Sequence, residues 1–189
     1  MFCHTSRIFE KISKIFPMNE ARNILLFIML LSVGSQVAIP FYPVPLTLQT
    51  LIIFYGALLL PPGQHFLSIL SWLCIGALGL PVFSSFSSGI GVILGPRGGY
   101  LLGVLWVAPL LSFCLRYRNT SQSVFWRMVV CYIGALFILL TGFFHLQWIM
   151  GETSLALEAG FFPFLGPELL KVFLAVKGYT YSSHYRRIK

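Results

Sequence analysis

The feature that most constrains this chain is a long segment without a single charged side chain. From Asn23 to Pro96 the sequence contains no Asp, Glu, Lys or Arg. One membrane span needs about 20 apolar residues, so this segment has the length of about three spans with their connections. The whole chain of 189 residues is 57% hydrophobic and only 10% charged, against roughly 25% charged residues in an average soluble domain. Composition therefore excludes a soluble globular domain and a disordered chain, and it predicts an integral membrane protein.

Turns rich in proline and glycine divide the apolar segments into predicted transmembrane helices. The stretches 40–45 and 61–64 are predicted turns, because proline fixes the backbone and restricts the residue before it. The last helix is expected to begin near Pro167, since a proline in the first turn loses no hydrogen bond. Solid apolar runs, rather than alternating polarity, argue against an outer-membrane barrel. The fold class is therefore an all-α membrane protein with six predicted helices, at about 23–39, 46–60, 65–82, 98–115, 128–151 and 167–181.

The positions of the basic residues predict the orientation of these helices. The N-terminal segment, the connection between the fourth and fifth helices, and the C-terminal tail together contain all but two of the 13 Lys and Arg residues. With six spans, these three regions lie on one side of the membrane, and Glu152 and Glu158 lie in a loop on the other. The positive-inside rule then predicts that both termini are cytoplasmic.

The remaining composition narrows the possible functions. Residues 1–22 have too long a basic region for a signal peptide, and they are predicted to form a short amphipathic helix on the cytoplasmic leaflet, with a frayed basic tail as the alternative. Topology and anionic lipid headgroups explain the net charge of +8 better than nucleic acid does. Scattered Cys and His residues and the lack of a P-loop sequence indicate no enzyme, no metal and no cofactor. The predicted segments are a basic amphipathic segment at 1–22, a membrane domain at 23–182 and a basic cytoplasmic tail at 183–189.

Two polar regions interrupt the apolar pattern. The segment 81–100 is rich in Ser and Gly, contains Arg97 and joins the predicted third and fourth helices on the outer side. The segment 161–171 places Glu168 and Lys171 three residues apart, which is one face of a helix. Ionisable side chains at membrane depth usually face a cavity. The alternatives are a flexible loop whose arginine meets headgroups, and a local ion pair favoured by the helix dipole.

Together these regions predict a pocket for a small amphiphilic carboxylate. The two cations could bind an anion, while the carboxylate, an amide and the serine hydroxyls could make directional hydrogen bonds between aromatic walls. The amide belongs to the segment 44–50, where Gln49 enters an otherwise apolar helix, and its alternative role is hydrogen bonding between helices. The predicted binding residues are Lys171, Arg97, Glu168, Gln49, Ser85, Ser87, Tyr100 and Phe83.

Four segments, in this order along the chain, resemble the BioY family of biotin-binding S components of energy-coupling factor (ECF) transporters: Val44–Thr50, Gly79–Phe83, Gly89–Leu101 and Pro163–Lys171. The resemblance covers roughly residues 20–180. Lys171 matches the lysine in the final helix of the family, and Glu168 stands where the family usually has Asp. Arg97 stands where many members carry Thr or another small residue.

The resemblance implies a six-helix subunit of the cell membrane that binds biotin for uptake. It implies as partners a transmembrane coupling subunit and two ATPase subunits, although some BioY proteins are thought to act without them. The alternatives are an S component for another small vitamin, or a membrane assembly subunit without a ligand. Two cations in the pocket disfavour the cationic vitamin thiamine, and riboflavin has no carboxylate for them to bind.

Overall fold

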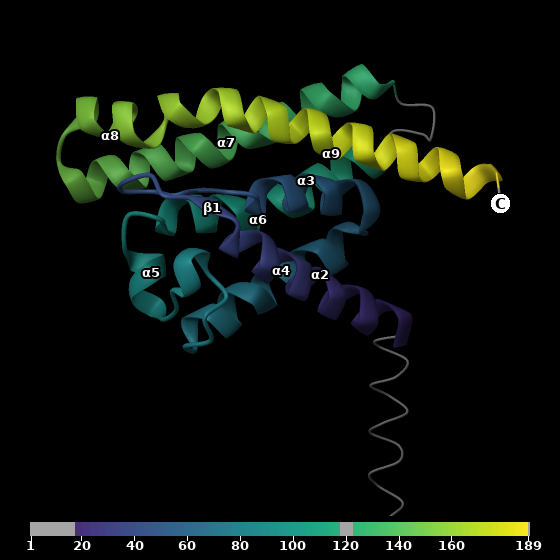
Figure 1. The fold of residues 1–189 in the computed structure, drawn as a ribbon, viewed down its shortest axis with the longest axis horizontal. Helices are drawn as coiled ribbons and strands as arrows, with labels where there is room; N and C mark the ends of the chain where they lie inside the picture. The colour runs from purple at the N-terminus through teal and green to yellow at the C-terminus, as the bar shows by residue number, and fades with distance from the viewer. Residues whose placement is uncertain (1–17, 118–122, 189) are drawn as a thin grey trace, which may run out of the picture.

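The computed structural model describes residues 18–117 and 123–188, which are mostly helical (Figure 1). Three helical stretches in the described residues are long and apolar enough to cross a membrane: Gly98–Arg116, Val124–Met150 and Thr153–Ser183. The helices are α2 Met18–Gln36, α3 Gln49–Leu59, α4 Pro62–Ala77, α5 Ile90–Leu94, α6 Gly98–Tyr117, α7 Val124–Met150, α8 Thr153–Gly160 and α9 Phe162–Ile188, and η1 Ser84–Phe86 is a 3-10 turn. The strands are β1 Ala38–Ile39 and β2 Leu46–Thr47.

Each predicted transmembrane helix has a counterpart, but several ends differ. The first helix begins at Met18, before Asn23, so it includes part of the segment predicted to lie on the membrane surface. Residues 1–17 of that segment lie outside the described residues. The last helix begins at Phe162 and continues to Ile188, so the prediction of a start at Pro167 and an end near 181 is wrong. Pro167 lies inside α9 because one proline removes a single backbone hydrogen bond, a loss that packed membrane helices tolerate.

The helices are arranged in two layers joined by a central pair (Figure 1). Helices α7, α8 and α9 lie together along one side, and α2, α4 and α5 lie along the other. Helices α3 and α6 lie between them: α3 packs against α9 and α6, while α6 packs against α7 and α4. A core of buried apolar side chains, including Ile53, Ile69 and Trp72, runs through this arrangement.

Glycine allows α6 and α7 to approach closely. Gly99 and Gly103 are four residues apart, so they lie on the same face of α6. A Cβ atom at Gly99 would lie 2.6 Å from the carbonyl oxygen of Thr141, and one at Gly103 would meet the hydroxyl of the same threonine. Small residues at such positions are typical of tight helix pairs in membranes. This contact places the first turns of α6, which carry Tyr100, directly beside α7.

A short hairpin and a loop cover one end of the helices. Strands β1 and β2 pair antiparallel, with Ala38 opposite Thr47 and Ile39 opposite Leu46. The proline-rich turn predicted at 40–45 connects the two strands, and it contributes Val44 to a small buried cluster with Leu139. The second covering element is the loop from Leu78 to Gly89, which contains η1.

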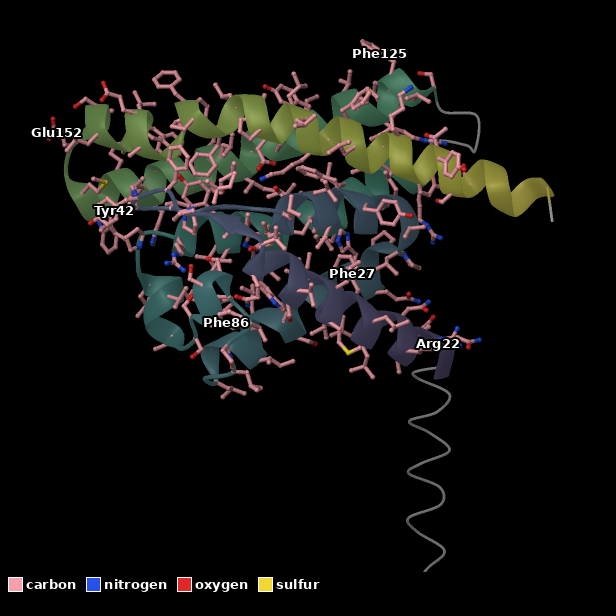
Figure 2. The ribbon with its side chains drawn as sticks, viewed as in Figure 1. Arg22, Phe27, Tyr42, Phe86, Phe125 and Glu152 are labelled. Carbon is pink, nitrogen blue, oxygen red and sulfur yellow. The ribbon has the colours of Figure 1, made fainter. Side chains whose placement is uncertain are left out.

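The two ends of the molecule differ in which residues they present. Figure 2 shows Tyr42 and Glu152 at one end of the long axis and Arg22 and Phe125 at the other. Many large apolar side chains are exposed along the helices between these ends, as expected for helices that face lipid. They include Leu25, Leu30, Trp106, Leu110, Phe137, Phe144, Leu170 and Phe173.

Candidate functional site

A pocket opens between the hairpin, the loop and the helices α3, α6, α7 and α9. Its wall is mostly apolar, and its polar groups come from four different parts of the chain. The polar lining residues are Thr47, Gln49, Thr50, Ser84, Arg97, Tyr100, Glu168 and Lys171; the apolar ones are Val44, Pro45, Phe83, Val92, Leu101, Val104, Ala135, Ile138, Leu139 and Phe164.

An ion pair between two residues of α9 forms one wall of the pocket. Glu168 and Lys171 are three residues apart, so the helix places both side chains on the face that meets α3. The Lys171 Nζ lies 2.6 Å from the Glu168 Oε1, and their side chains are only 7% and 4% exposed. The local ion pair that the sequence offered as an alternative is therefore present, although both residues also line the pocket. Burial shields the pair from solvent screening.

Thr50, in the first turn of α3, completes this group. Its hydroxyl donates to the Glu168 Oε1 at 2.8 Å and accepts from the Lys171 Nζ at 3.0 Å. These bonds link residues more than a hundred positions apart, and they hold the ion pair in one orientation against α3. The pair is therefore a rigid feature of the wall.

The second oxygen of Glu168 has no such partner. Its Oε2 atom is buried and makes no hydrogen bond among the described residues. A buried carboxylate oxygen without a donor is costly, and a water, an ion or a ligand can supply the missing donor. Lys171 also keeps one N–H, since an ammonium has three and two are used. This wall can thus accept a hydrogen bond and donate one, side by side.

Arg97 directly precedes α6, and among the described residues it and Lys171 are the two cations that line the pocket. Its Nη1 atom donates to the Ser84 carbonyl oxygen at 3.1 Å and to the hydroxyls of Ser84 and Ser87 at 3.0 Å. The described residues provide no partner for its Nε and Nη2 atoms. Partial burial lowers the pKa of Arg97, but arginine starts so high that it remains a cation. Arg97 can therefore bind an anion in the pocket while it holds the loop.

Aromatic side chains form much of the remaining wall. The Tyr100 hydroxyl donates to the carbonyl oxygen of Gly160 at 2.6 Å, so this side chain presents its ring to the pocket and its polar end to the junction of α8 and α9. Phe83 is 1% exposed and packs edge-on against Trp72, with ring centroids 4.9 Å apart. Gly76 makes this contact possible, because any Cβ there would run into the Phe83 ring.

The pocket contains all the predicted binding residues except Ser85 and Ser87. Ser85 is exposed because its backbone adopts a left-handed conformation, with φ of 60°, that turns this part of the loop away from the pocket. Ser87 instead binds Arg97, and its neighbour Ser84 reaches the wall. Thr50 was not predicted, although it directly follows Gln49 in the polar start of a helix. Within the described residues, no cluster of three or more His, Cys, Asp or Glu side chains could hold a metal ion.

The chain matches the model of the BioY family over residues 10–186. It is 38% identical over 157 residues to the "Probable biotin transporter BioY" of Pyrococcus horikoshii, which is 83% of this chain and 91% of that protein. It is 33% identical over 150 residues to the "Biotin transporter BioY" of Thermotoga maritima, covering 79% and 87%. The "Probable biotin transporter BioY" of Rickettsia prowazekii is 30% identical over 184 residues, covering 97% and 93%.

A solved structure has the same fold. It is described as the S-component for biotin from an ECF-type ABC transporter, and it superimposes with a TM-score of 0.78 over 85% of this chain and 88% of that one. The two sequences are 24% identical, so the match is evidence for the fold.

Proposed function

Because this chain belongs to the BioY family, we propose that it is the biotin-binding membrane subunit of a vitamin uptake system and not an enzyme. The observation that carries the proposal is the buried Glu168–Lys171 pair in the pocket wall, whose Glu168 Oε2 atom lacks a donor. The names of the relatives say that they transport biotin. A ureido ring has N–H groups and a carbonyl side by side, which is the pattern that such a wall complements.

We place the ureido ring of biotin against this wall. One of its N–H groups would donate to Glu168 Oε2, and its carbonyl oxygen would accept the remaining N–H of Lys171. Each bond involves an ionised protein group, so each contributes about 1.5–3 kcal/mol. Glu is longer than the Asp that the family usually has, and its bonds to Thr50 and Lys171 fix where the extra length reaches.

The carboxylate of biotin is better matched to Arg97 than to Lys171. The charge of Lys171 is already balanced by Glu168 at 2.6 Å, and a second carboxylate there would face a like charge. Arg97 has no carboxylate partner among the described residues, and its unused N–H groups form a fork that suits a carboxylate. The apolar chain and sulfur-containing ring of biotin would then lie along Tyr100, Phe164 and the α7 side chains.

The direct test is equilibrium binding of tritiated biotin to the purified chain, with thiamine and riboflavin as competitors. We expect one biotin per chain and no competition from either vitamin. Displacement by thiamine or riboflavin would assign the pocket to a different ligand. The absence of saturable binding by any of the three would support an assembly subunit.

We further propose a six-span topology with both termini in the cytoplasm, an N-terminal surface segment and a basic tail. The support is the sorting of the basic residues to one side, together with Arg22 and Phe125 at one end of the molecule and Glu152 at the other (Figure 2). Fusion of a cytoplasm-dependent fluorescent reporter to the C-terminus and at position 152 tests it. We expect fluorescence from the first fusion alone, and fluorescence at position 152 would refute the orientation.

The chain has no P-loop, so concentrative uptake requires a source of energy from other subunits. We propose that these are a transmembrane coupling subunit and two ATPases; the support is the matching structure, which is described as an S-component from an ECF-type ABC transporter. Copurification of the tagged chain with such subunits from its native membrane is the expected result. Full concentrative uptake by the chain alone in proteoliposomes would contradict the requirement.

A further inference from the structure

The loop that contains η1 is fastened to the end of α2 by one side chain. Gln36 is the last residue of α2, and its Nε2 atom donates to the carbonyl oxygens of Phe83 at 3.0 Å and Pro81 at 3.3 Å. Its Oε1 atom accepts the backbone N–H of Phe86 at 2.9 Å. A carboxamide has two N–H donors, and here both meet loop carbonyls while its oxygen meets a loop N–H. The whole polar end of Gln36 is therefore committed to this loop.

The loop needs such a fastening because part of it is strained. Ser85 and Phe86 have φ values of 60° and 53°, which non-glycine residues rarely adopt. Such a conformation persists only when the surrounding contacts hold it. Phe86 itself packs little against the protein, since the residue is 72% exposed. Its backbone N–H bond to Gln36 is one of the contacts that hold it.

The fastened loop is also a wall of the proposed biotin pocket. Phe83 and Ser84 both line the pocket, whereas Gln36 does not. One of the three bonds from Gln36 goes to a residue of this wall, Phe83, and the other two go to Pro81 and Phe86, each two residues from a wall residue. Arg97 also binds the loop, at Ser84 and Ser87. The loop is thus held by a residue of the pocket and by a residue outside it.

We propose that Gln36 is a positioning residue that latches residues 81–88 closed over the pocket and thereby slows the release of ligand. The ligand part of this proposal rests on the proposed biotin-binding function. Bound biotin would contact Phe83, Ser84 and Arg97, so movement of the loop away from α2 would remove contacts that hold it. Loss of the latch would raise the dissociation rate, while the buried Glu168–Lys171 wall and its contacts would be unchanged.

The first test measures biotin release from Gln36→Leu, which keeps the approximate size of the side chain and removes all three bonds. The purified chain is loaded with tritiated biotin and chased with unlabelled biotin. We expect the dissociation rate to be at least tenfold higher than in the wild type, which corresponds to an activation free energy of release lower by about 1.4 kcal/mol. Gln36→Glu keeps the acceptor for Phe86 and loses both donors, so it should also release biotin faster. Gln147→Leu is the matched control, because Gln147 also lies near the end of a helix, donates to the Thr153 hydroxyl and does not line the pocket.

The dissociation rate separates the latch from a general effect on folding. Misfolded molecules would lower the amount of biotin bound without changing how fast the bound fraction is released. An unchanged dissociation rate in Gln36→Leu would overturn the proposal, and so would an equal acceleration in Gln147→Leu.

The second test requires no ligand. Hydrogen exchange of the backbone amides in residues 83–89 is compared between the wild type and Gln36→Leu in the biotin-free protein. We expect at least tenfold faster exchange at Phe86, with α9 unchanged. Equal exchange at Phe86 would refute the latch even if release were faster. If the wild type binds no biotin, the proposed function fails, and this exchange experiment alone decides whether Gln36 holds the loop.

Discussion

Substitutions of the buried pair can separate its effect on stability from its effect on binding. Lys171→Met would leave the Glu168 carboxylate in a nearly closed site, with a hydroxyl from Thr50 but no cation. Glu168→Leu would leave the Lys171 ammonium in the same position without its counter-charge. Removing one partner of a buried ion pair typically costs about 3–5 kcal/mol. At about 2–4 °C per kcal/mol for a chain of this size, each single variant should unfold roughly 6–20 °C below the wild type.

The double variant should behave differently. Replacing both partners by apolar residues of similar volume leaves no isolated charge, and such replacements are often neutral or stabilising. We therefore expect Glu168→Leu/Lys171→Met to unfold within about 4 °C of the wild type, well above either single variant. All three variants should bind biotin at least tenfold more weakly, because each loses a charge-assisted hydrogen bond to the ureido ring.

The assay is thermal unfolding of the purified chain in detergent, followed by tritiated-biotin binding to the folded fraction. Lys177→Met is the matched control, since Lys177 lies on the same helix but is exposed over the Phe173 ring. It should change neither property by more than about 0.5 kcal/mol. A double variant as unstable as the single ones would refute the isolated-charge argument. A double variant that retains wild-type affinity would remove the pair from the binding site.

Three further outcomes are expected. Arg97→Ala should weaken the binding of biotin more than that of biocytin, which has an amide in place of the free carboxylate and would lose only the support that Arg97 gives the loop; equal weakening of both would indicate a role in the loop alone. Gly103→Ala should lower the free energy of unfolding by about 1–3 kcal/mol, because it crowds the contact of α6 with α7. Gly166→Ala is the control and should not destabilise the protein, because a Cβ there meets nothing within 4 Å. Equal thermal stability of the two variants would contradict the close packing. Tyr100→Phe should lower stability by about 1 kcal/mol through its lost hydrogen bond yet retain biotin affinity, and a large loss of affinity would assign the hydroxyl to the ligand.

The helical and apolar character of the chain could be predicted because charged residues are rare in it. Three helical stretches of the described residues have the length and composition of a membrane span. The ends of the helices were predicted less accurately. Pro167 is a good first-turn residue, but Pro163 is one too, and the sequence alone does not decide between them. The observed start at Phe162 places Pro163 in the first turn of α9 and Pro167 in its interior.

The candidate site was predictable where it depends on local spacing. Glu168 and Lys171 meet because residues three apart share a helix face. Thr50 joins them only because α3 packs against α9, a contact that no local pattern contains. The serines of the loop could not be told apart from the sequence either. The positive φ at Ser85 decides which of the hydroxyls in 84–88 reach the pocket, and nothing in a run of serines indicates where such a φ occurs.

The predicted orientation of the chain rests on where its basic residues stand in the sequence, whereas the arrangement of the pocket depends on contacts between distant helices. For this reason the membrane class could be deduced from composition, while the latch at Gln36 could not. Gln36 directly precedes the hairpin, and nothing in its sequence neighbourhood indicates that its amide binds a loop about 50 residues later.

The measurement that tests the central claim most directly is an experimental structure of the purified chain with biotin bound. We predict density for biotin between α3, α6 and α9, with a ureido nitrogen within about 3 Å of the Glu168 Oε2 and the carboxylate at Arg97. Biotin bound outside this pocket, or reversed so that its carboxylate meets Lys171 and its ureido ring meets Arg97, would contradict this account.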